Sequence, residues 1–408
     1  MNGRFEVAVT GIGMVTPAGI GVAESWRRIC LGESTARPDP DLSGMPVDFT
    51  CRVPGFNADD QLGRRTAWRQ ERFVHLARVA AREAVADAGL DPAHWNSARV
   101  GVVMGNSLGG SSTYEQQLNT LRAKGPHGVS PLMIPMIGVG SVTGEIAIDC
   151  SATGPNLTTV TACASAATAI GTARELLRSG MCDVVITGGT ESALSPTLMA
   201  GFTQLGALSR RVDDPAAASR PFDADRDGFV ASEGAGVLVL ERAADALVRK
   251  ATIRAMISGY GASADAHHMT APRPDGACVE QATRAALADA GVLPDEVDHV
   301  NAHGTSTPLN DVTEARLIRR VFGDRPVITS VKGAIGHSLA AAGGIEAICT
   351  VLAIQHGVVP PTANLVTQDP EIELDIVAKV PREMPIRVAV SNSIGFGGAN
   401  AVLVLTAA

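Results

Sequence analysis

The sequence predicts an α/β protein made of two related halves, and three observations support this prediction. A chain of 408 residues exceeds the size at which a single hydrophobic core usually stops growing. Apolar residues make up 45% of the chain but aromatic residues only 3%, which is typical of sheets of Val, Ile and Ala covered by helices. A helix–turn–strand pattern also occurs twice, over residues 80–105 and 282–304, with the letters ADAG at 86–89 and again at 288–291.

Each copy of this pattern consists of an amphipathic helix closed by a glycine, a turn with Pro and Asp, and a Val-rich strand. Two further strand–helix–strand units follow in matching order, over residues 155–189 in the first half and 326–405 in the second. The matching order favours duplication over a chance likeness of four letters. We therefore expect an N-terminal half over residues 1–250 and a C-terminal half over residues 251–408.

Composition and charge exclude several classes of protein. A net charge of −8 argues against nonspecific binding to nucleic acid, which requires a broad basic surface. The N-terminus lacks the features of a signal peptide, and no stretch has the roughly 18 apolar residues of a membrane span. The seven cysteines are scattered and never occur as C-x-x-C, which disfavours a disulfide framework or a zinc site. We expect a cytoplasmic protein with no nucleic-acid or membrane partner.

Cys163 lies where the sequence changes from a strand pattern to a helix pattern. Residues 158–161 predict a strand and residues 164–177 a helix, so the cysteine occupies a tight turn between small residues. Backbone N–H groups at a helix N-terminus favour negative charge, so we expect a thiol pKa below the usual value of about 8.5. The same N–H groups can hold an oxyanion. The alternative is a buried core cysteine, which is the commonest fate of a lone cysteine.

Three turns in the second half, each at the end of a predicted strand, contain residues that could take part in catalysis. His303 lies in "VNAHGTSTPLND", Lys332 and His337 lie in "SVKGAIGHSLAAAGG", and Phe396 lies in the Gly-rich "SNSIGFGGANA". Ligands bind at the carboxyl ends of strands in α/β sheets. A single histidine is more often an ordinary surface or core residue than a catalyst, but three such turns together with Cys163 predict one shared site.

Several long motifs in order now identify a resemblance. "TACASA", "NAHGTSTP", "KGAIGHSLAAAGG" and "GFGGANA", with residues 218–241 and 358–365, resemble the elongating β-ketoacyl-acyl-carrier-protein synthases of the thiolase superfamily. The likeness covers nearly the whole chain. It implies a thiolase fold of two duplicated α/β halves in α-β-α-β-α layers, with no organic cofactor. It also implies a dimer, either a homodimer or a heterodimer with a chain-length-factor-like subunit.

The resemblance further implies a decarboxylative Claisen condensation, with chemistry that these residue types can support. Cys163 would take an acyl chain from an acyl carrier protein, and malonyl-carrier protein would then lose carbon dioxide and attack that chain. His303 and His337 would stabilise the developing enolate, and Lys332 would orient a histidine. The backbone N–H groups of Cys163 and Phe396 would form the oxyanion hole.

The family pattern also assigns substrate contacts. Thr305 and Thr307 would bind the pantetheine arm, and Thr270 would line the same channel; turn-capping hydroxyls are the alternative. Ile394 stands where many fatty-acid members have a gating phenylalanine, which favours a type II polyketide or polyene pathway over housekeeping fatty-acid synthesis. The expected residues of the acyl pocket or dimer seam, which as apolar residues are otherwise ordinary core, are Leu108, Met133, Met136, Ile137, Ala193, Leu198 and Phe202.

Two further sets of residues carry weaker expectations. Some family members hold a structural Na⁺ or K⁺, and the matching positions here are Asn301, Ala302, Glu346, Ser391 and Asn392. Ser391 departs from the Asn of some members, which puts occupancy of the cation site in doubt.

An acidic carrier protein would dock on a cluster of basic residues, for which an ordinary solvated helix face is the alternative interpretation. This cluster comprises Arg64, Arg65, Arg69 and Arg72, with Arg210 and Arg211 as further members.

Single residues distinguish an elongating condensing enzyme from the alternative functions. A thiolase would carry a second cysteine in the C-terminal Gly-rich loop, and "SNSIGFGGANA" has none. A chain-initiating synthase would have Asn in place of His337. A non-catalytic chain-length subunit would lack the nucleophile that Cys163 supplies. A pure acyl-binding protein remains open at this stage.

Overall fold

The strands of the central sheet repeat one arrangement in the two halves of the chain. The computed structural model describes residues 6–408, and its main sheet has eleven strands. In the first half the strand order is β6 (Asn156–Thr159), β5 (Val100–Gly105), β7 (Val184–Ser192), β8 (Glu233–Arg242) and β1 (Val7–Thr16). In the second half it is β11 (Val327–Thr329), β10 (His299–Asn301), β14 (Val388–Gly395), β15 (Ala399–Thr406) and β9 (Ala255–Ala264).

The pairing directions also match between the halves. β5 runs parallel to β6 and β7, and β8 runs antiparallel to both β7 and β1. Likewise β10 runs parallel to β11 and β14, and β15 runs antiparallel to both β14 and β9. The halves meet where β1 and β9 pair over two residues each, Ala8 with Met256 and Val9 with Ala255. The duplication expected from the ADAG repeat is therefore visible in the topology.

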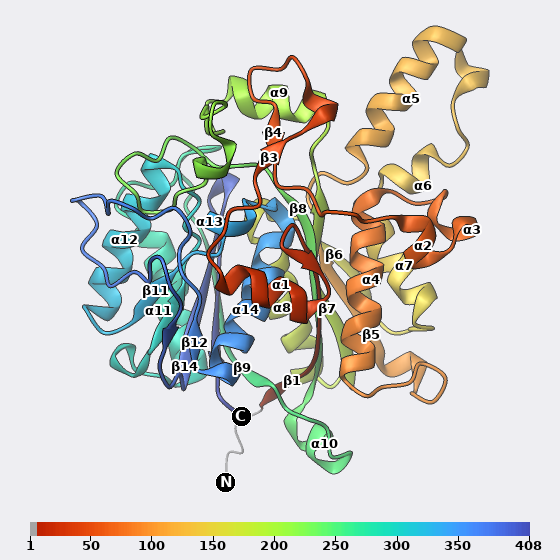
Figure 1. Ribbon diagram of the computed structural model, residues 1–408. Coiled ribbons are helices and arrows are strands. Elements are labelled where there is room, and N and C mark those ends of the chain that lie inside the picture. The colour runs from red at the N-terminus through yellow and green to blue at the C-terminus, as the bar shows by residue number, and fades with distance from the viewer. Residues whose placement is uncertain (1–5) are drawn as a thin grey trace.

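Helices complete a five-layer α-β-α-β-α arrangement. Two helices, α8 (Ser165–Arg178) and α14 (Ala342–His356), lie in the middle of the molecule between the two halves of the sheet (Figure 1). The outer layers contain α4 (Arg72–Asp87), α7 (Ser141–Asp149), α11 (Ala277–Ala290) and α12 (Pro308–Phe322). The predicted α/β class is confirmed.

The repeat packs its outer helix on its long strand in the same way twice. A Cβ atom on Gly11 of β1 would overlap the carbonyl oxygen of Ala84 on α4, and one on Gly259 of β9 would overlap that of Ala286 on α11. Only glycine on the strand and alanine on the helix allow so close an approach. The alanine-rich composition of the repeat is thus explained by helix–strand contact.

One segment departs from the expectation that no stretch is long and apolar enough to span a membrane. Residues 339–356, which end in α14, reach a mean hydropathy of 1.4 over 18 residues. This segment is 89% buried inside the protein. Its apolar character is explained by contact with strands on both sides, because every residue of α14 from Ala342 to Ala353 is buried.

The remaining elements are short or peripheral. They are β2 (Gly19–Ile20), α1 (Val22–Cys30), β3 (Arg37–Pro38), β4 (Phe49–Thr50), α2 (Ala58–Leu62), α3 (Arg64–Ala67), α5 (Ser111–Lys124), α6 (Met133–Ile137), α9 (Pro196–Gln204), α10 (Ala243–Val248), α13 (Lys332–Ile335), β12 (Val358–Val359) and β13 (Arg382–Glu383).

Candidate active site

Cys163 lies in a short turn between β6 and α8. β6 ends at Thr159, two residues before the predicted end of the strand, and a 3-10 turn over Ala162–Ala164 leads into the helix. Ala162 has a φ of 47°, a left-handed conformation that is costly for a residue with a Cβ atom. The turn is therefore held in place by its surroundings rather than by local preference.

The second half repeats this turn without a nucleophile. A 3-10 turn over Leu339–Ala341 precedes α14, and its first residue, Leu339, has a φ of 49°. Counting from the first residue of the turn places Ala340 at the position that Cys163 occupies in the first half. The duplicated fold thus supplies two equivalent turns, of which only one carries a thiol.

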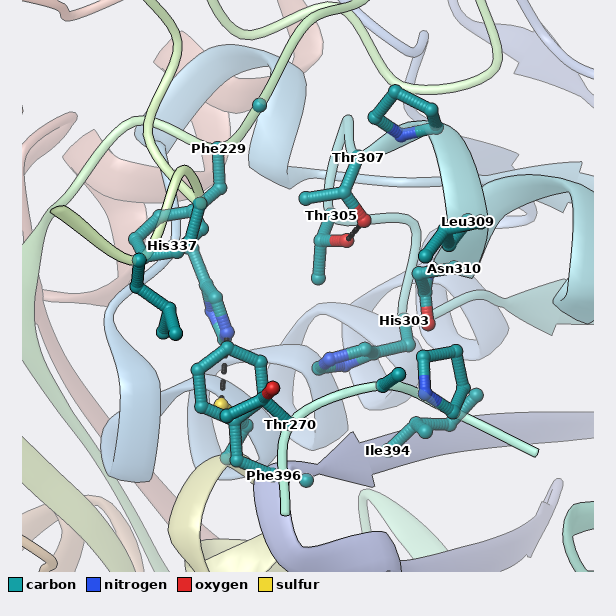
Figure 2. Close-up of a pocket in the computed structure, with 18 of the residues that line it drawn as sticks. Phe229, Thr270, His303, Thr305, Thr307, Leu309, Asn310, His337, Ile394 and Phe396 are labelled. Carbon is teal, nitrogen blue, oxygen red and sulfur yellow. Dashed lines mark hydrogen bonds between the residues drawn. The ribbon is translucent and has the colours of Figure 1, made fainter. Parts of the chain in front are cut away.

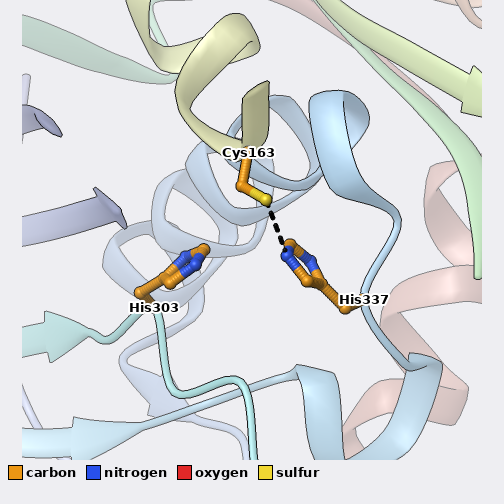
Figure 3. Close-up of side chains that lie close together, drawn as sticks. All are labelled: Cys163, His303 and His337. Carbon is orange, nitrogen blue, oxygen red and sulfur yellow. Dashed lines mark hydrogen bonds between the residues drawn. The ribbon is translucent and has the colours of Figure 1, made fainter. Parts of the chain in front are cut away.

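Two imidazoles from the second half lie beside the thiol (Figure 3). His337 Nε2 is 3.1 Å from Cys163 Sγ. The rings of His303 and His337 are nearly perpendicular at 86°, with centroids 5.2 Å apart. One side-chain ligand atom from each of the three residues lies within 4.8 Å of the others. The structure therefore brings together the sulfur and both predicted histidines.

Phe229 positions the His337 ring, and sequence reasoning did not single it out. The two rings meet edge to face, at 81° and 5.4 Å between centroids. The backbone of the same segment pairs with His337, whose N–H donates to the Val230 carbonyl over 2.8 Å. Residues 218–241 resembled the family as a stretch, but nothing local in the sequence indicates which distant ring Phe229 contacts.

Lys332 is buried beside His303. Its Nζ donates to the carbonyl oxygen of His303 over 2.6 Å and lies 3.4 Å from that ring's Nδ1. The ammonium also forms an ion pair with Glu346, which is buried as well. A cation at Nδ1 places the histidine's own proton on Nε2, the nitrogen that faces Cys163 and His337. In this tautomer His303 Nε2 carries a proton and has no free lone pair for a metal ion. This protonation opposes binding of a transition metal by the three residues.

Glu314 holds the loop that carries His303, and it was not predicted from the sequence. Its carboxylate accepts hydrogen bonds from the backbone N–H groups of His303 and Gly304, each over 2.8 Å. It also accepts one from Asn392 Nδ2 over 3.1 Å. The available signal was the group of polar residues Asn310, Asp311 and Glu314, spaced to share the buried face of the helix after "NAHGTSTP".

Burial sets the protonation states of the site. It lowers the pKa of both His303 and His337 well below the ordinary 6.5, and the charge of Lys332 lowers each pKa further. Both rings are therefore neutral at pH 7. Burial also raises the pKa of the Cys163 thiol to about 11, although the Lys332 charge and the Phe396 N–H oppose this rise.

The expectation of a lowered cysteine pKa is therefore wrong for the ligand-free site. The reason is that desolvation of a thiolate at a buried turn outweighs the partial charge of the helix N-terminus. The resting nucleophile is a neutral thiol, and His337 Nε2 is the nearest group that can accept its proton.

The Gly-rich turn lies against the cysteine turn. A Cβ atom on Gly395 would lie 2.7 Å from the Thr161 carbonyl oxygen and 3.2 Å from the Cys163 nitrogen. The next residue, Phe396, donates its backbone N–H to the Cys163 sulfur. Glycine at 395 thus allows the backbone N–H groups of Cys163 and Phe396 to lie side by side, as an oxyanion hole requires.

A cavity of about 370 Å³ connects this group of residues to the surface (Figure 2). It is lined by residues of both halves. The predicted members are Cys163, Thr270, His303, Thr305, Thr307, His337, Ile394 and Phe396. Thr305 and Thr307 share a hydrogen bond of 2.8 Å between their hydroxyl oxygens. Lining residues that sequence reasoning missed include Leu205, Phe229, Leu309 and Asn310.

Other predicted substrate residues lie outside this cavity. Leu108 is 37% exposed at the surface. Phe202 packs edge-on against Phe229 at 5.6 Å, in the apolar cluster that borders Cys163 and also contains Ala193 and Leu198. Met133, Met136 and Ile137 belong to α6 and are not among the residues that line the cavity. Within one chain the structure does not bring these residues to the cavity.

The four arginines of the predicted basic cluster have two different environments. Arg64, Arg65 and Arg69 are exposed, and within residues 6–408 their side chains form no ion pair. Arg69 instead stacks over the exposed Trp68, with its guanidinium 5.0 Å from the ring centre. Arg72 differs from the other three, because its guanidinium pairs with the buried Glu233 over 2.6 Å as α4 begins. Its charge is compensated within the protein.

Comparison with known proteins agrees with the fold and the site. Residues 4–246 match the family model described as Beta-ketoacyl synthase, N-terminal domain, and residues 254–366 match its C-terminal domain. The chain is 44% identical over 405 residues to 3-oxoacyl-[acyl-carrier-protein] synthase 2 of Synechocystis sp., covering 98% of this chain and 97% of that protein. It is 43% identical over 409 residues to the synthase of the same name from Staphylococcus aureus, covering 99% of each.

Solved structures show the same architecture. The ishigamide ketosynthase/chain length factor superposes with a TM-score of 0.93 at 36% identity, with 100% of both chains covered. A type II PKS ketosynthase, solved in complex with its acyl-carrier protein and bound to the hexaketide, superposes with a TM-score of 0.91 at 32% identity, again with 100% of both chains covered.

Fold and site together define a condensing acyltransferase of the thiolase fold. The two family models and the identity across the whole chain make the membership specific. The chain belongs to the β-ketoacyl synthase family.

The neutral histidines make stability depend on pH. Below about pH 6.5 the unfolded chain protonates both imidazoles while the folded chain does not, so the free energy of unfolding decreases as pH falls. Between pH 7.5 and 5.5 this loss amounts to at most about 1.4 kcal/mol per histidine. Urea unfolding of wild type and of the His303→Asn/His337→Asn variant at both pH values measures it. An equal loss in the two proteins would contradict the assignment.

Proposed function

We propose that the protein joins an enzyme-bound acyl chain to a malonyl unit, with loss of carbon dioxide, to give a β-ketoacyl thioester. One observation carries the proposal: a thiol and two neutral imidazoles meet at the closed end of one cavity. The 3-oxoacyl-[acyl-carrier-protein] synthases to which the chain is similar support the same reaction class.

In the first step Cys163 Sγ attacks the carbonyl carbon of an acyl thioester. The thiol proton passes to His337 Nε2, which lies 3.1 Å away. The N–H groups of Cys163 and Phe396 stabilise the oxyanion of the tetrahedral intermediate. The intermediate then collapses, the pantetheine thiolate leaves with the proton from His337, and the acyl chain remains on the sulfur.

In the second step a malonyl thioester enters the emptied cavity and loses carbon dioxide. The electron pair of the broken C–C bond forms an enolate, whose oxygen accepts hydrogen bonds from His303 and His337. His303 already carries its proton on Nε2, because the Lys332 ammonium lies at its Nδ1. His337, whose Nε2 accepts the thiol proton in the first step, provides the second donor in its other neutral tautomer, with the proton on Nε2. The carbanion attacks the acyl carbonyl carbon, the bond from that carbon to the Cys163 sulfur breaks, and the departing thiolate takes up a proton from solvent.

The cavity suits a pantetheine arm. The hydrogen-bonded hydroxyls of Thr305 and Thr307 face the cavity, and Thr270 approaches from the loop on the other side (Figure 2). Leu205 and Leu309 are large exposed apolar residues on the lining, 48% and 65% exposed. We assign the threonines to the polar amides of the arm.

An acyl carrier protein is the proposed partner. Arg64, Arg65 and Arg69 form a cluster of positive charge without an ion-pair partner among residues 6–408. A carrier protein is acidic, so the two surfaces complement each other despite the net charge of −8. Trp68 at its centre is 58% exposed, as an aromatic anchor at an interface would be. The neighbour solved with its carrier protein supports this partner.

We also propose a dimer formed through the edge strand β6. This strand ends the sheet order, and an uncovered edge favours pairing with another chain. Large apolar residues around this edge are exposed, among them Ile134, Ile148, Leu157 and Val160. The seam would also hold Leu108, Met133, Met136 and Ile137. The second subunit would be a copy of this chain or a chain-length-factor-like relative, and the similarity to the ishigamide ketosynthase/chain length factor supports the latter possibility.

Ile394 supports a type II polyketide or polyene pathway. It lines the cavity near His303, where an aliphatic side chain leaves more room than a phenyl ring. The polyketide neighbours among solved structures agree with this choice, while the fatty-acid relatives support housekeeping synthesis as the alternative. Either pathway places the enzyme in the cytoplasm.

A structural Na⁺ or K⁺ fits the predicted positions. Asn301 Oδ1, Asn392 Oδ1 and Glu346 Oε2 are buried and have no hydrogen-bond partner among the described residues. Oxygen donors without partners are what a hard monovalent cation requires. These three residues would hold the ion, with backbone oxygens of Ala302 and Ser391 completing the set. The ion would add positive charge beside Glu346 and join the strand ends that carry the site.

The proposed reaction is tested by separating its two steps. Wild type incubated with acyl-carrier protein should gain the acyl mass on Cys163, and malonyl-carrier protein should then yield β-ketoacyl product. Cys163→Ala should not be acylated but should retain decarboxylation of malonyl-carrier protein, whereas His303→Ala should lower decarboxylation by on the order of a hundredfold. Intact-protein and product mass spectrometry follow both steps.

An unacylated wild type, or acylation that survives Cys163→Ala, would exclude the condensing mechanism. A panel of acyl primers of different lengths, run with wild type and Ile394→Phe, tests the pathway assignment. The variant should shift the preferred chain length, and an unchanged preference would remove the argument from Ile394.

Docking is tested by charge reversal. The Arg64→Glu/Arg65→Glu/Arg69→Glu variant should raise KM for acyl-carrier protein about tenfold or more, because like charges then meet at the interface. Turnover of a free acyl-pantetheine thioester should not change. Arg325→Glu, at an exposed site in the other half, is the matched control. Equal KM values for carrier protein in wild type and the triple variant would place docking elsewhere.

A further inference from the structure

Ser165, the first residue of α8, bridges two backbone groups of the cysteine turn. Its side chain is fully buried. The hydroxyl accepts a hydrogen bond from the Thr161 N–H over 2.9 Å and donates one to the Ala162 carbonyl oxygen over 2.7 Å. Both bonds are short and well made, so one hydroxyl restrains the backbone on both sides of the left-handed residue Ala162.

The second of these bonds adds to the one that the Ser165 backbone N–H donates to the same carbonyl oxygen, and so further restrains the orientation of the Cys163 N–H. The carbonyl of Ala162 and the N–H of Cys163 belong to the same planar trans peptide, so they point in opposite directions. Holding the carbonyl toward Ser165 therefore turns the N–H away from the helix. The Cys163 nitrogen in fact faces the Gly-rich turn, 3.2 Å from where a Cβ atom on Gly395 would stand.

The duplicated turn shows that the hydroxyl is not required for the backbone conformation. Leu339 begins that turn with a φ of 49°, against 47° for Ala162. The first residue of the following helix α14 is Ala342, which has no hydroxyl. The half of the chain without a nucleophile therefore forms the same turn without this bridge. The hydroxyl is therefore present only in the turn that carries the thiol, and the shape of the turn does not depend on it.

We propose that Ser165 is a positioning residue for the oxyanion hole: through the Ala162 carbonyl it aims the Cys163 N–H at the substrate carbonyl oxygen during acyl transfer. This inference rests on the proposed function of Cys163 as the acyl acceptor. Ser165 touches neither the substrate nor the sulfur. Its effect is confined to reactions at Cys163 that develop an oxyanion.

Two reactions at the same sulfur separate this role from a general structural one. Acylation by an acyl-pantetheine thioester passes through an oxyanion, whereas alkylation by iodoacetamide displaces iodide and forms none. Ser165→Ala, which installs the residue already present at 342, should lower the acylation rate on the order of ten- to a hundredfold. The alkylation rate should stay within about twofold, because the thiol and its surroundings do not change. Intact-protein mass spectrometry measures both rates.

Two further variants serve as controls. Thr172→Ala removes a hydroxyl that bonds only within α8 and should change neither rate. Ser165→Thr keeps the hydroxyl and should retain more of the acylation rate than Ser165→Ala does.

Three results would overturn the proposal. They are an unchanged acylation rate in Ser165→Ala, an equal fall of acylation and alkylation, and a failure of this variant to fold, which would show that the hydroxyl serves the turn itself. A wild type that is not acylated at all would instead contradict the proposed function.

Discussion

The site depends on how closely the two central helices approach each other. A Cβ atom on Gly343 of α14 would lie 2.9 Å from the Ala167 nitrogen of α8, and one on Gly344 would lie 2.6 Å from the Gly236 carbonyl oxygen of β8. Glycine at these positions lets the start of each helix reach the middle of the molecule. Cys163 precedes one helix and His337 the other, so this packing brings the sulfur to the imidazole.

Burial at this meeting point then determines the chemistry. One cation, Lys332, is buried among neutral rings and is compensated by Glu346 and by the His303 carbonyl oxygen. A buried charge is tolerated only with such partners. Burial, together with this charge, keeps the pKa of both histidines low and the rings neutral, and the ammonium fixes a donor tautomer on His303, which is what an enolate requires. The same burial holds the resting cysteine as a thiol.

The two halves show how a duplicated fold acquires one active site. Both contain a left-handed turn before a central helix, at Ala162 and at Leu339. The first half adds a thiol and a bridging hydroxyl there, while the second supplies His303 and His337 from the ends of its own strands. Each half is incomplete alone, so the reaction requires both to share one core.

The amino-acid sequence by itself determined the repeat, the α/β class and the positions of Cys163, His303, Lys332 and His337 at turns after strands. These features depend on residues near one another in the chain, and local patterns record them. Only the tertiary structure decided the thiol's protonation state and the pairing of Arg72 with Glu233. It alone also revealed the supporting contacts of Phe229 and Glu314. Desolvation and side-chain contact depend on atoms brought from remote parts of the chain, and no local pattern encodes which ones arrive.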